Sequence, residues 1–144
     1  MMTKSVAEVA MLFSLLAMGV AAGSPPVLAE ERVNVPGETY TNVSPAELKA
    51  MLDRKDFLLV NVHIPYEGEI EGTDAFVPFN RVRSQIHLFP QARDAKILLY
   101  CEGGPMSETA ARELIRLGYT NIWHLKGGFD AWEKAGYPLI KRNP

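Results

Sequence analysis

Cys101 is the residue of this sequence best placed to do chemistry. It follows the apolar run 95–100, precedes Glu102-Gly103-Gly104-Pro105-Met106, and is followed by an amphipathic segment that begins near Ser107. A thiol between the end of a strand and the start of a helix meets unpaired N–H groups and the positive end of the helix dipole, which favour the nucleophilic thiolate. The two glycines allow the loop to curl so that successive N–H groups point at one centre. The segment is therefore predicted to form an anion-binding loop around the sulfur.

A second interpretation of Cys101 is an inert thiol at the end of a buried strand, where free cysteine is common. The chain contains one cysteine, so no intramolecular disulfide is available to it. The glycine pair favours the reactive interpretation, because a flexible Gly-Gly turn destabilises the loop and an inert thiol does not need it.

Alternating strand and helix patterns predict how this loop is held. Ser44-Pro45-Ala46-Glu47 is a capping box that opens a helix to about residue 53. Continuous apolar runs are typical of strands covered on both faces, and helical periodicity separates them. We expect an α/β fold with a central parallel sheet of about five strands and helices on both faces. The expected elements are strands at 40–43, 57–62, 75–79, 95–100 and 121–125 and helices at 44–53, 81–88, 107–117 and 129–134.

The carboxyl ends of parallel strands are where ligands bind in such sheets. Cys101 ends one strand, and Asn61 and His63 end another. His63 is therefore a candidate proton relay or a cation that favours the thiolate. The alternative is a histidine that is hydrogen-bonded to the backbone and only locks its loop. His87 and His124 are assigned no role.

The N-terminus predicts targeting. Lys4 precedes an apolar stretch from Val9 to Ala22, which is followed by Pro25-Pro26 and then Val27-Leu28-Ala29. This order is typical of a secretory signal peptide over residues 1–29, with export or a periplasmic location, and no membrane attachment after its removal. A retained anchor or an amphipathic helix packed on the domain is the alternative. Residues 30–39 are expected to be a flexible tail, and 40–144 the folded domain.

Composition excludes other classes. The 144 residues are 47% hydrophobic and 22% charged, with a formal net charge of −2, as in an ordinary globular domain. No cluster of Lys and Arg with interleaved aromatic residues is present, so no nucleic-acid partner is expected.

The sequence from residue 96 to 138 resembles the C-terminal half of a rhodanese domain, and the capping helix and strand 57–62 match the N-terminal half more loosely. The resemblance is carried by Cys101-x-x-Gly104-x-x-Ser107, Gly118-Tyr119-x-Asn121-Ile122, Leu125-x-Gly127-Gly128 and Ala131-Trp132.

The resemblance implies a sulfurtransferase that forms a persulfide on Cys101. Sulfur would pass from thiosulfate or a persulfide to a thiophilic acceptor in a ping-pong cycle without metal or cofactor. Partners would be small sulfur donors and acceptors or a persulfide carrier. The alternative is a low-turnover domain that carries or senses sulfur or docks onto a partner. The implied substrate-binding residues are Glu102, Gly103, Gly104, Met106 and Ser107, the last through its hydroxyl as well.

The loop departs from the family pattern. Many members carry Arg at the position of Met106, Glu102 adds a negative charge beside the nucleophile, and Pro105 lacks an N–H. These changes predict weak activity on thiosulfate, or a neutral or cationic donor such as a persulfide carried by another molecule. Phosphatases that share the fold need Arg at position 107, and Ser107 argues against that chemistry.

An acidic segment replaces the family's usual Gly-His-Ile turn after strand 57–62. Its carboxylates and His63 could bind a cation, although their spacing matches no ligand pattern. A solvated loop is preferred, and no metal is expected. The acidic residues are Glu67, Glu69, Glu71 and Asp74.

Overall fold

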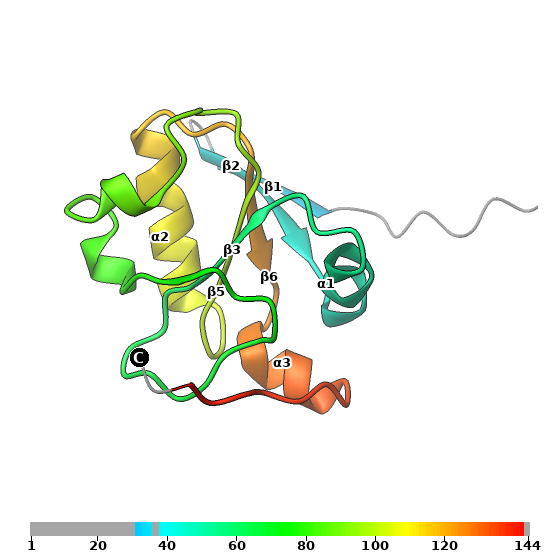
Figure 1. The fold of residues 1–144 in the computed structure, drawn as a ribbon. Helices are drawn as coiled ribbons and strands as arrows, with labels where there is room; N and C mark the ends of the chain where they lie inside the picture. The colour runs from blue at the N-terminus through cyan, green and yellow to red at the C-terminus, as the bar shows by residue number, and fades with distance from the viewer. Residues whose placement is uncertain (1–30, 36–37, 143–144) are drawn as a thin grey trace, which may run out of the picture.

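A mixed sheet forms the centre of the computed structural model, which describes residues 31–35 and 38–142. Figure 1 shows helices on both sides of the sheet. The strands are β1 (Glu31–Val35), β2 (Glu38–Val43), β3 (Leu58–Asn61), β4 (Ala75–Phe76), β5 (Ile97–Tyr100) and β6 (Ile122–Leu125); the helices are α1 (Pro45–Leu52), α2 (Pro105–Arg116) and α3 (Gly128–Lys134), with 3-10 turns η1 (Phe79–Arg81) and η2 (Ile86–Leu88). The predicted signal segment 1–29 lies outside the described residues.

The strand order is β1-β2-β6-β5-β3-β4. The five strands from β2 to β4 pair in parallel, which confirms the predicted sheet, and β1 adds an antiparallel edge. β5 lies between β6 and β3 and is buried along its whole length. The residue after β5 is Cys101, so the thiol lies at the carboxyl edge of the sheet, in its middle.

Two hydrophobic clusters separate the faces of the sheet. One face is covered by α2, through Ala110, Ala111 and Leu114, together with the segment that contains η1 and η2. The other face is covered by α1, through Leu48, and by α3. Because both faces are covered, the central strands are apolar without alternation, as the sequence predicted.

The capping box of α1 is confirmed. Ser44 Oγ accepts from the N–H of Glu47, and the Glu47 carboxylate accepts from the N–H of Ser44. Pro45 at the first helical position supplies a fixed φ where no N–H is needed.

Three elements of the structure differ from those expected from the sequence. Residues 31–35 form β1 where a tail was expected, because the backbone of this segment pairs with β2 from Glu31 to Val35. The helix expected at 81–88 is wrong: the segment makes η1 and η2, since short irregular apolar spacing does not support a continuous α-helix. α2 begins at Pro105 and not at Ser107, so Ser107 lies in its first turn.

The described part of the chain contains no helix of sufficient length and apolarity to cross a membrane.

Candidate active site

Cys101 lies at the base of a surface hollow. Only 1% of the residue is exposed, yet it lines a space of about 270 Å³ at the carboxyl edge of the sheet. The remaining lining residues are His63, Glu102, Gly103, Pro105, Met106 and Asp130. All but His63 and Asp130 come from the loop predicted from the sequence.

Two donors contact the sulfur. The N–H of Gly104 lies 3.0 Å from Sγ, and the hydroxyl of Ser107 lies 3.3 Å from it. Gly104 has φ +127°, a conformation that L side chains rarely adopt, so the loop geometry depends on a glycine here. The predicted cradle of several N–H groups is smaller than expected: among the described residues, one backbone N–H and one hydroxyl bond Sγ.

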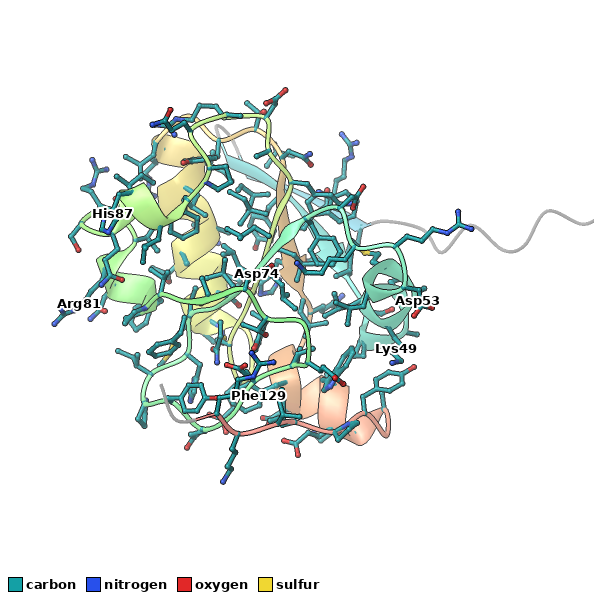
Figure 2. All side chains as sticks on the ribbon, viewed as in Figure 1. Lys49, Asp53, Asp74, Arg81, His87 and Phe129 are labelled. Carbon is teal, nitrogen blue, oxygen red and sulfur yellow. The ribbon has the colours of Figure 1, made fainter. Side chains whose placement is uncertain are left out.

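The start of α3 holds the loop from behind. The N–H of Phe129 donates to the carbonyl of Cys101 at 2.9 Å, and the N–H of Asp130 donates to the carbonyl of Glu102 at 3.0 Å. Gly128 permits this approach, because a Cβ on it would lie within 3.0 Å of both carbonyl oxygens. Figure 2 shows Phe129 at the start of α3. The Gly127-Gly128 turn therefore positions the loop that carries Cys101.

A hydrogen-bonded chain runs behind the sulfur. The Ser107 hydroxyl lies 2.8 Å from Nε2 of His124, and Nδ1 of His124 lies 2.8 Å from Oδ1 of Asn42. Ser107 and His124 are buried. Burial lowers the pKa of His124, which favours its neutral form. Sequence reasoning missed this chain, although a histidine inside the apolar strand 122–125 was a signal of a partnered polar group.

Acidic side chains surround the mouth of the hollow. Glu102 turns toward His63, with its carboxylate 3.7 Å from Nε2. Nε2 of His63 also lies 2.9 Å from the carboxylate of Glu67. His63 therefore faces the hollow, and its ring bonds a carboxylate where one interpretation expected the backbone. Asp130 adds a further negative charge to the lining.

Asn61 acts on the loop that carries His63. Its Nδ2 donates to the carbonyl of Gly68 at 3.0 Å, and its Oδ1 accepts from the N–H of His63 at 3.0 Å. Asn61 is fully buried and does not line the hollow. Its observed contacts fix the start of the acidic segment.

The acidic segment does not gather its carboxylates into one cluster. Asp74 pairs with Lys55 and with the N–H of Leu59, while Glu69 pairs with Arg142. Among the described residues, the grouping that best fits a cation is His63 with Glu67 and Glu102. Glu67 and Glu102 are about half exposed, and His63 is already hydrogen-bonded to Glu67, so these three side chains form a hydrogen-bonded acidic mouth to the hollow.

Position 107 distinguishes sulfur chemistry from phosphate chemistry. A phosphatase loop of this length places a guanidinium there to grip phosphate. In this protein the residue is Ser107, which is fully buried and bonds the sulfur itself. Position 107 therefore offers a hydroxyl to the sulfur and no bidentate grip for phosphate.

The chain has known relatives. The protein from Synechocystis sp. called uncharacterized protein slr1261 is 35% identical over 107 residues, which are 72% of this chain and 58% of that protein. The tRNA uridine(34) hydroxylase of Citrobacter koseri is 32% identical over 89 residues, which are 58% of this chain and 25% of that enzyme. This chain therefore spans between a quarter and three fifths of the length of these two relatives.

Solved structures show the same fold. The thiosulfate sulfurtransferase of Pseudomonas aeruginosa is similar with a TM-score of 0.58 and 25% identity, over 69% of this chain and 20% of that one. The family model described as the rhodanese-like domain matches residues 44–135, which contain the whole loop and both glycines that hold it. The chain therefore belongs to the rhodanese-like domain family.

Proposed function

We propose that this protein is a sulfurtransferase that carries sulfane sulfur as a persulfide of Cys101. The observation that carries the proposal is the sulfur itself, placed at the base of a hollow and contacted by the N–H of Gly104 and the hydroxyl of Ser107. Membership of the rhodanese-like domain family and the similarity to a thiosulfate sulfurtransferase support this class of activity.

The proposed cycle has two half-reactions. The Cys101 thiolate attacks the outer sulfur of the donor, a new S–S bond forms, and the donor's own bond to that sulfur breaks. The electron pair of the broken bond leaves with sulfite or with the donor thiolate. A thiophilic acceptor then attacks the outer sulfur of the persulfide and regenerates the Cys101 thiolate. The two donors to Sγ stabilise the negative charge on sulfur.

The first test is sulfur uptake by the wild-type protein. The protein is incubated separately with thiosulfate and with a small-molecule persulfide, and its intact mass is measured. We expect a gain of one sulfur atom, mapped to Cys101, and thiocyanate formation when cyanide follows. If the protein takes up sulfur from neither donor, the proposal is contradicted.

The acidic mouth favours a donor that is not a dianion. Glu102 and Asp130 line the hollow, and no Lys or Arg of the described part of the chain does. Thiosulfate is repelled by such a lining, while a persulfide on a neutral or cationic carrier is not. We therefore propose a carried persulfide as the better donor.

A single charge tests this preference. Met106 lines the hollow and is only partly buried, so Met106→Arg places a guanidinium beside the incoming donor. We expect kcat/KM for thiosulfate to rise about tenfold, since about 1.4 kcal/mol of favourable charge interaction corresponds to that factor. The gain should shrink in high salt. Steady-state kinetics with thiosulfate and cyanide measure it.

Leu88→Arg is the matched control for this change. Leu88 is exposed and lies outside the hollow, so the Leu88→Arg variant adds the same charge away from the site. An equal effect of both variants, or no gain from Met106→Arg, would rule out repulsion at the mouth as the cause of weak thiosulfate activity.

The second candidate function is a low-turnover sulfur carrier or sensor that acts with a partner. The 1% exposure of Cys101 and the hydrogen-bonded acidic mouth favour it, because both limit access of small acceptors. Stable persulfide on Cys101 without thiocyanate release would support it over the enzyme. Export directed by residues 1–29 stays a proposal for either function.

A further inference from the structure

We infer that His124 takes up the proton of the Cys101 thiol through the hydroxyl of Ser107. His124 does not touch the sulfur, so it acts as a positioning residue for the proton. Its value to the protein rests on the proposed function, in which the thiolate is the attacking group.

The geometry is a continuous chain of hydrogen-bonding atoms. Sγ of Cys101 lies 3.3 Å from Oγ of Ser107, and this oxygen lies 2.8 Å from Nε2 of His124. The opposite ring nitrogen, Nδ1, lies 2.8 Å from Oδ1 of Asn42. Three elements supply the members: Ser107 is in the first turn of α2, His124 is in β6, and Asn42 is in β2. Cys101, Ser107 and His124 are all at most 2% exposed, so bulk water does not compete with the chain.

Asn42 sets the direction of the chain. The atom that lies 2.8 Å from Nδ1 of His124 is the amide oxygen Oδ1 of Asn42, which can only accept a hydrogen bond. An acceptor at Nδ1 requires that Nδ1 carry the hydrogen, which leaves a lone pair on Nε2. The basic nitrogen of His124 therefore points at Ser107.

The proton transfer balances without any further reactant. The hydroxyl of Ser107, which also has the carbonyl of Gly104 as an acceptor at 2.9 Å, turns its hydrogen to Nε2 of His124 and gives it up there. The thiol hydrogen of Cys101 moves to Oγ of Ser107. The products are a thiolate and an imidazolium, with a neutral hydroxyl between them that now donates to the sulfur. When the acceptor removes the outer sulfur of the persulfide, the proton returns along the same path.

The surroundings of His124 suit a base that is neutral at rest. Burial lowers the pKa of His124, while the carboxylate of Glu108 in α2 and the carbonyl of Gly104 oppose that shift. The ring of Tyr40 from β2 packs edge-on at 5.6 Å. The imidazolium would thus lie near a carboxylate and a carbonyl and would be separated from the new thiolate by one hydroxyl, and all three groups stabilise positive charge.

The test is a pH titration of the thiolate in the full-length protein. The ultraviolet absorbance of the thiolate is followed against pH, and the same titration of Cys101→Ser is subtracted. Since the chain has one cysteine, the difference reports one sulfur. In His124→Gln the side chain can no longer take a proton. We expect the pH at which half of the sulfur is ionised to rise by about one unit or more relative to the wild type, because the thiol proton loses its acceptor.

Ser107 provides the second, independent pair. Ser107→Ala breaks the link and should shift the titration as His124→Gln does, while Ser107→Thr keeps a hydroxyl and should restore the wild-type curve. His87→Gln is the matched histidine control, because His87 is exposed in η2 and does not line the hollow.

A titration of His124→Gln or of Ser107→Ala that matches the wild type would overturn the inference. A shift in Ser107→Ala that Ser107→Thr does not reverse would overturn it as well, because the hydroxyl would then be irrelevant. If His124→Gln does not fold, as judged by circular dichroism, the Ser107 pair decides alone. No sulfur donor is used, so failure of the sulfurtransferase proposal leaves this result interpretable.

Discussion

Cys101→Ser is expected to abolish sulfur uptake and thiocyanate formation, with a loss of at least about 10⁴-fold relative to wild type. A hydroxyl at this position stays protonated at neutral pH and cannot form a persulfide. The chain contains no second cysteine that could replace the first. Intact mass after incubation with a persulfide donor, and the rate of thiocyanate formation, measure the loss.

The substitution should leave the fold in place. A serine Oγ can accept from the N–H of Gly104 and exchange a hydrogen bond with Ser107, the two groups that contact the sulfur now. We expect the free energy of unfolding to change by less than about 1 kcal/mol, measured by urea denaturation. Residual uptake close to the wild-type rate would show that another group receives the sulfur, and the persulfide proposal would be abandoned.

The fold could be predicted from the sequence because its strongest signals are local. The capping box at Ser44 begins a helix by pairing with backbone three residues away, and the structure keeps those contacts. The apolar runs of β3 and β5 gave strands buried on both faces, which is the pattern of a parallel sheet. Such signals do not depend on which segments meet later.

Elements that depend on a distant partner were not predicted. Strand β1 exists through its backbone pairing with β2, and a polar segment of five residues carries little strand signal alone. The region of η1 and η2 follows the surface of α2, so its short turns are set by tertiary packing and not by helical periodicity.

The same difference between local signals and distant partners applies to the candidate active site. The loop from Cys101 to Ser107 could be identified because its residues are consecutive. The chain behind it joins residues 42, 107 and 124, and no spacing in the sequence indicates that three elements bring them together. The register of β2 against β6 is what aligns Asn42 with His124.

The role of Gly128 was also hidden, since its neighbours are the carbonyls of Cys101 and Glu102 from another part of the chain. We expect Gly128→Ala to destabilise the protein by roughly 3 kcal/mol or more, because a methyl group would overlap both carbonyl oxygens and φ is +60°. α3 must then move away from the loop, and the N–H groups of Phe129 and Asp130 lose their acceptors. Sulfur uptake should fall about 100-fold, as expected for a reacting atom misplaced by about 1 Å.

Gly103→Ala is the matched control for stability. A Cβ on Gly103 meets nothing within 4 Å, so the same added methyl group should change the free energy of unfolding by less than about 1 kcal/mol. Urea denaturation compares the two variants, and intact mass gives the rate of sulfur uptake on Gly128→Ala under conditions where it is still folded. If Gly128→Ala proves as stable and as active as the wild type, α3 does not hold the nucleophile in place, and the hydrogen bonds from Phe129 and Asp130 to the loop are dispensable.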